Sequence, residues 1–366
     1  MIVSKFKNLF FWIGAIVFLP LFNLFAMRKS KNKELRILII PHLTRVGDLI
    51  CVTPTIRAIK QKYPTSFVAV AVGKKIAPIL ENNPYVDAIT TYRAHEVFNF
   101  LRKIYRRNFN WVFNFSGTSF GTLISIYGAI PNRVKLVKEE RAMDEILSDK
   151  LNNFRFLYKN HTDPILHYLN MLKVLGIESV DTKKDVFISK DGELKAERFN
   201  GFLVGVSVSA GNKIKEWGDE KFKELAVKIN EKHSAKIIFM GAPNDEARIL
   251  RIVENLDKEN FWVATNFSLS ELPSLIKKLK LYIAPDTGPI HIADALEVPF
   301  VDIVGPVDPN ELPPKRDYGI LVKPPSHIKP SVFAFKKNGP LSEQKKALDA
   351  ISMENVLSAV ETLLLR

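Results

Sequence analysis

Residues 281–309 constrain the fold most, because they read as a strand, a short polar turn, a helix and a second strand. The apolar run Leu281–Ala284 stops at Pro285, and the turn Asp286–Pro289 then opens a helix that tolerates proline in its first turn. The free N–H groups and the positive dipole end of such a helix favour an anion beside the carboxyl end of the strand. The segment therefore predicts an α/β sheet, with either a phosphate site or an ordinary helix cap at this turn.

Two residues of this segment offer different chemistry. Asp286 is itself anionic, so it suits a helix cap or the hydroxyl groups of a ribose better than a phosphate. His291 falls in the first helical turn and has a ring N–H that a ligand could accept.

Two earlier strand–turn–helix units strengthen the interpretation of a ligand site. Arg36–Pro41 is typical of a buried parallel strand, and Asp48 follows at the start of a helix, where it is either an N-cap or a catalytic carboxylate. The strand Phe202–Val208 precedes small residues and lysines in 209–217. Such a loop suits a phosphate, although most loop lysines are simply solvated.

Four motifs, in the order and spacing of one family, carry a resemblance over nearly all of the chain after residue 30. They are GDLICVTPTIRAIKQKYP (47–64), the loop that ends Lys215-Glu216-Trp217, GAPNDEARI (241–249), and APDTGPIHIADALEVP with VGPVDP (284–299 and 304–309). The chain resembles glycosyltransferase family 9, the bacterial heptosyltransferases that build the inner core of lipopolysaccharide. This resemblance implies an α/β fold of GT-B type, in which two Rossmann-like domains face each other across a cleft.

The resemblance also implies roles for individual residues. Asp48 matches the proposed catalytic base, and Lys215 matches the lysine that contacts the donor diphosphate. Donor contacts are further expected at Ser209, Gly211, Asn212, Lys213, Met240, Glu246, Asp286, Thr287, Gly288, Pro289 and His291, and acceptor contacts at Arg45 and Gly47. The residues around Glu246 fit two interpretations, the wall of a nucleotide-binding pocket and the capped start of a helix.

The loop after the third strand departs from the family pattern. Val208–Gly211 stands where the family usually has Pro-Gly-Ala-Ser, and Lys215–Gly218 reads Lys-Glu-Trp-Gly where Lys-Arg-Trp-Pro is frequent. Gly211 still permits close backbone approach, but the family's hydroxyl is lost or moved to Ser209. The sequence therefore predicts a nucleotide-sugar donor and leaves the sugar and the nucleotide open.

Length and patterning predict two domains. The 366 residues exceed what one hydrophobic core usually covers, and 46% hydrophobic content indicates a globular chain. A charged, turn-rich segment between Gly176 and Phe202 marks the boundary. We predict an acceptor domain at residues 34–190, a nucleotide-sugar domain at 198–322, and a tail at 323–366 whose C-terminal helix packs back on the first domain, by analogy with other GT-B folds.

Residues 1–33 predict a hydrophobic anchor. Phe10–Ala26 contains 17 residues without a charge, and basic residues flank it on both sides. The positive charge after the apolar run argues against an exported signal peptide, while Pro20 leaves both a spanning and an interfacial segment open. We expect residues 9–27 to anchor the protein on the cytoplasmic face of the inner membrane.

The charge of the chain indicates anionic partners. Lys and Arg number 53 against 39 acidic residues, a formal net charge of +14. No nucleic-acid-binding motif accompanies basic stretches such as Arg102–Arg107, so we expect a membrane surface and an anionic glycolipid rather than nucleic acid, although solubility alone would also explain the excess. The single Cys51 excludes an intramolecular disulfide and fits a reducing compartment.

Other chemistries lack their motifs. The sequence has no Asp-x-Asp pair, no cysteine pair and no Gly-x-Gly-x-x-Gly, so we expect no metal ion and no cofactor. The expected function is inverting, metal-independent sugar transfer, with heptose from ADP-heptose moved onto a lipopolysaccharide core or related glycolipid. Alternatives are a transferase of another nucleotide-activated sugar, a sugar-nucleotide epimerase of the same fold, and a non-catalytic glycolipid-binding relative.

Overall fold

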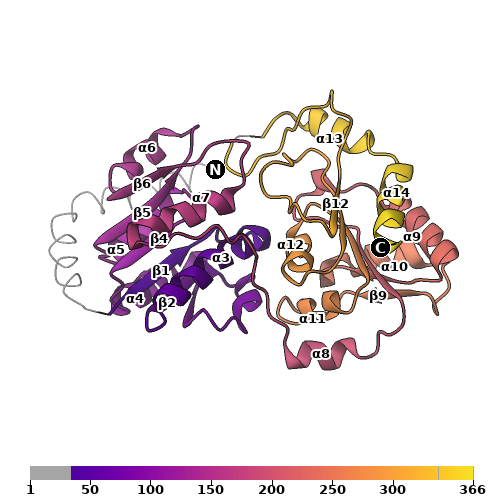
Figure 1. Cartoon of the computed structure of the whole chain (residues 1–366), viewed down its shortest axis with the longest axis horizontal. Coiled ribbons are helices and arrows are strands. Elements are labelled where there is room, and N and C mark those ends of the chain that lie inside the picture. Colours follow the sequence, from indigo (N-terminus) through magenta and orange to yellow (C-terminus); the bar gives the residue numbers. More distant parts are fainter. Residues whose placement is uncertain (1–33, 337, 366) are drawn as a thin grey trace.

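The computed structural model describes residues 34–336 and 338–365, which form two α/β domains side by side (Figure 1). Each domain is built on a parallel six-stranded sheet, which confirms the predicted two-domain fold of GT-B type. The proposed anchor at residues 9–27 lies outside the described residues. Among the described residues, no helix combines the length and the apolar character needed to cross a membrane.

The first domain carries a sheet in the order β3-β2-β1-β4-β5-β6. Its strands read as continuous apolar runs because helices cover both faces of the sheet. The strands are β1 Arg36–Ile40, β2 Phe67–Gly73, β3 Ala88–Tyr92, β4 Trp111–Asn114, β5 Asn132–Val137 and β6 Phe154–Leu157. The helices are α3 Val46–Lys62, η1 Ala77–Leu80, η2 Ala94–Glu96, α4 Val97–Arg106, α5 Ser119–Tyr127, α6 Met143–Asp149, α7 Pro164–Met171 and η3 Leu172–Leu175.

The second domain repeats this topology, with a sheet in the order β12-β11-β10-β7-β8-β9. Its strands are β7 Leu203–Ser207, β8 Lys236–Met240, β9 Phe261–Ala264, β10 Leu281–Pro285, β11 Phe300–Ile303 and β12 Gly319–Val322. Its helices are α8 Lys190–Ala196, η4 Lys213–Lys215, α9 Asp219–His233, η5 Pro243–Asp245, α10 Glu246–Val253, α11 Leu272–Lys277, α12 Gly288–Ala295, α13 Leu341–Asp349 and α14 Met353–Leu364.

The strand order places the two ligand-binding edges. In each sheet the strand order reverses between two neighbouring central strands, so that successive strands are added outward on either side of this point. These strands are β1 and β4 in the first domain and β7 and β10 in the second. Open α/β sheets bind ligands in the crevice at the carboxyl ends of such strands. The turns that follow β1, β7 and β10 are therefore the positions where this fold can build a site.

The two domains meet where α3 packs against α12, with the N-terminal ends of the two helices in contact. A Cβ atom built on Gly47 would lie 2.7 Å from Cδ2 of His291. One built on Gly288 would lie 2.8 Å from Cβ of Val46. The backbones approach this closely only because both positions are glycine.

An extended linker, residues 177–189, joins the domains and contains no helix or strand. It is fixed to α3 by Arg57, whose guanidinium pairs with Asp185 and, at 3.0 Å, with Asp181. The backbone N–H of Asp185 also donates to Oγ1 of Thr53 at 2.8 Å. The linker therefore follows the same helix that carries Asp48.

Helix α8 follows the linker and packs on the second domain. Its Lys195 pairs with Glu271 at 2.8 Å, beside the N-terminal end of α11. In the structure, the second domain thus begins with α8, ahead of its first strand at Leu203.

The tail differs from the sequence-based expectation. Helix α14 packs against the sheet and α9 of the second domain, not on the first domain, because Val356 and Val360 on its apolar face join that domain's core (Figure 1). The indole N–H of Trp217 fixes the preceding turn by donating to the carbonyl of Ile351 at 2.9 Å. The loop before α13 returns to the first domain, where the ring of Phe335 lies 4.7 Å from that of Tyr158.

We predict that Gly288→Ala lowers the free energy of unfolding by about 1–3 kcal/mol, because the new methyl group overpacks against Val46. The substitution should cost less in a Val46→Gly background, which removes the opposing side chain. Urea unfolding of the four proteins in this cycle measures both values. Gly211→Ala is the matched control, since a Cβ there meets no atom within 4 Å. Equal costs of Gly288→Ala in both backgrounds would contradict the proposed close contact.

Candidate active site

A cavity of about 600 Å³ opens between the domains at the meeting point of α3 and α12. We call it the interdomain cavity. The first domain contributes the turn after β1 and the start of α3, and the second contributes the turns after β7 and β10. Eleven of the predicted residues line it: Arg45, Gly47, Asp48, Gly211, Asn212, Lys215, Asp286, Thr287, Gly288, Pro289 and His291.

Four predicted donor residues lie outside the lining that the described residues form: Ser209, Lys213, Met240 and Glu246. The hydroxyl of Ser209 points away to Asp245, to which it donates at 2.9 Å. Met240 is buried at the end of β8, whereas Lys213 and Glu246 are exposed. Their expected donor contacts therefore have no counterpart in the geometry of this cavity.

Asp48 is a buried carboxyl group in the first turn of α3. It is not the N-cap, because Arg45 occupies that position and forms no side-chain cap bond. Burial raises the pKa of Asp48, the positive charges of Arg45 and Lys215 oppose this rise, and Asp286 adds to it. Such a carboxyl group holds a proton more readily than an exposed one, as a general base requires.

Lys215 faces Asp48 from the second domain. Its ammonium lies 2.6 Å from Oδ2 of Asp286, at the N-terminal end of α12. The other carboxylate oxygen of Asp286 is buried and has no hydrogen-bond partner among the described residues. Thr287 stands at the N-cap position of α12 but caps no N–H with its side chain. The ammonium and the uncapped N–H groups together form a positively charged wall of the cavity.

His291 of α12 lines the interdomain cavity, and its ring lies against Gly47 of α3. Burial and the nearby Lys184 lower the pKa of His291 to about 3, so its imidazole is neutral at ordinary pH. Nδ1 lies 3.0 Å from Nζ of Lys184 and 3.7 Å from Sγ of Cys51. The opposite edge of the ring faces Gly47.

Sequence reasoning missed the buried Asp302. This residue is 0% exposed on β11, and neither carboxylate oxygen has a hydrogen-bond partner among the described residues. Burial, reinforced by the charge of Asp286, holds the pKa of Asp302 well above its usual range. An acidic residue inside the apolar run Phe300–Ile303 was the available signal.

Arg248 accounts for the unusual loop after β7. Glu216, which stands where the family has a cation, pairs with Arg248 at 2.8 Å, and Arg248 also pairs with Asp219 at 2.6 Å. The second oxygen of Glu216 accepts from the backbone N–H of Ala210 at 3.3 Å. The anion at this position is therefore neutralised and fixes the loop that carries Lys215.

A second cavity, of about 550 Å³, adjoins the interdomain cavity on the side of the first domain. We call it the flanking cavity, and the two share Arg45 and the segment Phe333–Ala334. Its charged and titratable lining consists of His42, Arg45, Lys138, Glu140, Arg141, Glu145 and Lys336. Burial and the charges of Arg45 and Lys138 lower the pKa of His42 to about 4, so this ring is neutral.

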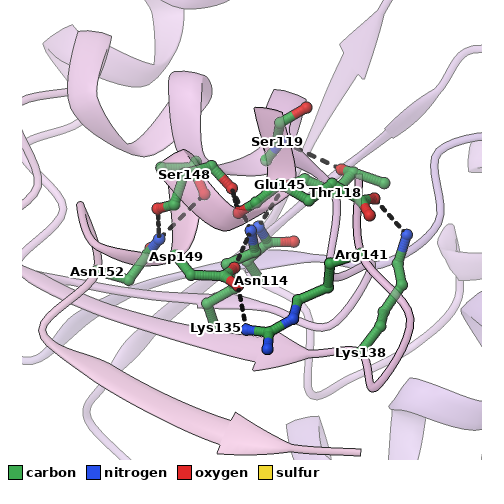
Figure 2. Close-up of polar contacts among 12 residues, drawn as sticks. Asn114, Thr118, Ser119, Lys135, Lys138, Arg141, Glu145, Ser148, Asp149 and Asn152 are labelled. Carbon is green, nitrogen blue, oxygen red and sulfur yellow. Dashed lines mark hydrogen bonds and ion pairs between the residues drawn. The ribbon is translucent and has the colours of Figure 1, made fainter. Parts of the chain in front are cut away.

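Helix α6 holds two cations of the flanking cavity in place (Figure 2). Glu145 pairs with Lys138, and Asp149 pairs with Arg141 at 3.1 Å. Asp149 is itself held by the fully buried Lys135, whose ammonium lies 2.6 Å from its carboxylate. The side chain of Arg141 remains 36% exposed, so it can still meet an anion.

The sequence model of glycosyltransferase family 9 (heptosyltransferase) matches residues 97–331. The chain belongs to this family. It is 24% identical to lipopolysaccharide heptosyltransferase 3 of Escherichia coli K12, over 87% of this chain and 95% of the relative. It is also 24% identical to the lipopolysaccharide core heptosyltransferase OpsX of Haemophilus influenzae, over 78% of this chain and 83% of the relative.

Solved structures show the same fold. A glycosyl transferase of family 9 from Veillonella parvula superposes with a TM-score of 0.74 and 23% identity, over 90% of this chain and 97% of that chain. The E. coli ADP-heptose lipopolysaccharide heptosyltransferase II gives 0.72 and 17%, over 90% and 99%. UDP-GlcNAc 2-epimerase from Methanocaldococcus jannaschii gives 0.53 and 14%, over 91% and 93%. The resemblance to family 9 seen in the sequence motifs is confirmed, and the protein is a glycosyltransferase.

We predict that Asp302→Asn removes a pH-dependent destabilisation of this glycosyltransferase. A carboxyl group whose pKa is raised by folding keeps its proton when the unfolded chain has lost it. Stability of the natural protein should therefore fall as pH rises above about 4, with a contribution of about 1.4 kcal/mol per pH unit until the folded pKa is passed. Urea unfolding between pH 4 and 8 should show the variant gaining stability relative to the natural protein. Parallel curves would contradict a protonated Asp302.

Proposed function

We propose that this glycosyltransferase transfers heptose from ADP-heptose to a lipopolysaccharide core or a related anionic glycolipid, by an inverting, metal-independent reaction. The observation that carries the proposal is that Asp48 of one domain and Lys215 of the other line the same cavity. The choice of substrates is supported by the relatives, whose names give lipopolysaccharide heptosyltransferase activity and ADP-heptose.

Asp48 is the base of the proposed reaction. Its carboxylate accepts the proton of an acceptor hydroxyl while that oxygen attacks the anomeric carbon of the donor. The bond from that carbon to the diphosphate breaks on the opposite face, so the configuration inverts. The raised pKa of the buried Asp48 supports this role, because a base is most effective when its pKa lies near the working pH.

The charge that grows on the departing diphosphate is stabilised by the second domain. Lys215 and the N–H groups at the start of α12 lie on one wall of the cavity. A bound diphosphate would take over the ammonium that Asp286 now holds at 2.6 Å, which would leave Asp286 free to accept from hydroxyl groups of the donor. These fixed positive groups supply what a divalent cation would otherwise provide.

The flanking cavity is the proposed place of the acceptor's anionic groups. It adjoins the cavity that Asp48 lines, and its own lining includes Lys138 and Arg141. Together with Arg45, which both cavities share, these cations suit a phosphorylated or carboxylated glycolipid. Attachment to the cytoplasmic face of the inner membrane through residues 9–27 remains part of this proposal and would bring such a lipid within reach.

The competing functions differ in their products. An epimerase of this fold would convert the nucleotide-sugar with no acceptor present, and a binding protein would convert nothing. Mass spectrometry of the purified protein with ADP-heptose, with several hexose nucleotides, and with or without Kdo-lipid A separates the three. The proposal requires a product whose mass exceeds that of the acceptor by one heptose, formed only when both substrates are present. If a hexose nucleotide served as donor and ADP-heptose did not, the choice of donor would be overturned.

Asp48→Asn should lower turnover by about two to four orders of magnitude, because the amide cannot accept the proton. Affinity for ADP should stay within a few fold, since the proposed contacts to the diphosphate come from the second domain. Steady-state kinetics and calorimetry measure these two quantities. Lys215→Met is the matched variant across the cavity and should weaken ADP binding and turnover together. Near-normal turnover of Asp48→Asn would remove Asp48 from the role of base.

Arg141→Gln should raise the KM for the glycolipid acceptor by about tenfold, because one charge-assisted contact to an anion is lost. The KM for the nucleotide-sugar should not change. Arg251→Gln provides the control, since Arg251 is an exposed arginine on α10 that lies outside both cavities as the described residues line them. If the two variants gave the same acceptor KM, the flanking cavity would not be the acceptor's anion site.

A further inference from the structure

Lys184 is a buried cation in the linker between the domains. Lys184 is only 2% exposed, whereas Lys183 and Asp181 of the same linker lie at the surface. The ammonium reaches away from the linker to α12, where it lies 2.7 Å from Oδ2 of Asp294 and 3.0 Å from Nδ1 of His291. A charge buried this deeply is retained only where its partners hold it.

The contact with Lys184 decides where the proton of His291 lies. An ammonium group has three donors and no acceptor, so Nδ1 of His291 must accept. In a neutral imidazole the single proton is then on Nε2. The thiol of Cys51 approaches the same Nδ1 atom at 3.7 Å, and burial raises the pKa of Cys51 to about 12, so it also remains a donor. Both neighbours of Nδ1 thus favour the same tautomer.

The protonated edge of His291 faces Gly47, and both residues line the interdomain cavity. Cδ2 and Nε2 lie 2.7 and 3.0 Å from a Cβ atom built on Gly47, whose backbone lines that cavity together with Lys215 and the start of α12. A donor at this place adds to the positive wall that faces a diphosphate. With the proton on Nδ1 instead, the same edge would present a lone pair to an anion.

We propose that Lys184 is a positioning residue of the donor site, which holds His291 as the Nε2–H tautomer so that the ring donates to an anionic oxygen of the donor diphosphate. This inference rests on the proposed function, because it takes a nucleoside diphosphate as the ligand of the interdomain cavity. Lys184 acts through His291 and lies behind it, on the side of the ring away from the cavity.

The linker segment that contains Lys184 is fixed to both domains. The adjacent Asp185 is fixed to α3 by Arg57 and Thr53, while Lys184 is fixed to α12. One short segment of chain therefore holds the helix of the catalytic carboxylate and the helix of the donor site. His291 can present its Nε2–H group in this way only while the linker keeps its contacts with both helices.

Lys184→Met is suited to test the proposal, because Asp294 keeps other partners. Arg316 Nε donates to Oδ1 of Asp294 at 2.8 Å, and the hydroxyl of Tyr318 donates to the same oxygen at 3.1 Å. The variant therefore removes the donor to His291 without leaving an isolated buried carboxylate. The exposed neighbour Lys183, which pairs with Glu297 at 2.7 Å on the surface, provides the matched control Lys183→Met.

The central measurement is a double-mutant cycle on ADP affinity by calorimetry. Lys184→Met should weaken ADP binding by about 10- to 100-fold, the usual loss for one hydrogen bond to a charged group, while Lys183→Met should leave it unchanged. In a His291→Gln background, whose amide cannot change tautomer, Lys184→Met should have little further effect. Unchanged affinity of Lys184→Met, or an equal loss in both backgrounds, would overturn the proposal.

Nitrogen NMR of the imidazole rings provides a readout that a merely structural lysine would not move. In the ligand-free natural protein, the signals of His291, assigned with His291→Gln, should show a protonated Nε2 and an unprotonated Nδ1. A proton on Nδ1 would overturn the proposal even if Lys184→Met failed to fold. If the natural protein binds no ADP while Nε2 is protonated, the proposed function has failed and not the tautomer assignment.

Discussion

The site of this glycosyltransferase depends on one close contact, the approach of the N-terminal ends of α3 and α12 at Gly47 and Gly288. Each helix begins directly after a central strand of its own sheet, so this contact brings the ligand-binding edges of the two sheets together. Without it, Asp48 and Lys215 would each face solvent from a separate domain. Because the backbone of Gly47 packs against the ring of His291, and that of Gly288 against the side chain of Val46, neither glycine leaves room for a side chain of its own.

The electrostatics of the cavity follow from this contact. Asp286 raises the pKa of both Asp48 and Asp302, and the ammonium of Lys215 opposes this effect at both carboxyl groups. Burial holds the pKa of Asp302 well above its usual range, whereas Asp286 is paired with Lys215. The pKa of Asp48 therefore depends on how the charges of Asp286 and Lys215 are arranged. A bound diphosphate would add negative charge near Asp48, and the cations Arg45 and Lys215 would oppose the resulting rise in the pKa of Asp48.

Local sequence patterns were sufficient to predict the strands and the turns that follow them, whereas the cleft between two domains and most residues of the cavity were implied by the resemblance to family 9. Apolar runs such as Leu281–Ala284 define the strands, and parallel strands place the turns that follow them at one edge, so Asp48, Lys215 and Asp286 could be located from turn positions. Lys184 could not be found in this way, since its buried partners on α12 lie more than 100 positions away in the sequence. Asp302 left one local signal, an acidic residue inside an apolar run, which sequence reasoning did not use. The final helix shows the same limit: its apolar face was visible in the sequence, but not which domain would receive it. Glu246 and Ser209 were assigned from the family motif, and their orientation depends on contacts that the motif does not contain.

In the altered loop after β7 the residues of the motif have changed, but Lys215 still lies at the cavity. An anion at residue 216 beside a diphosphate site would repel the ligand if it were free. Here Arg248 pairs with Glu216, and the backbone of Ala210 donates to the same carboxylate, so the charge is directed away from the cavity. Lys215 is the neighbour of this fixed residue and is therefore held where it can reach Asp286. The position of Lys215 thus depends on a pair of residues 32 positions apart, Glu216 in the loop motif and Arg248 in the motif at 241–249. A change at Arg248 would then act on the proposed donor site through Glu216, even though the described lining of the cavity does not include Arg248.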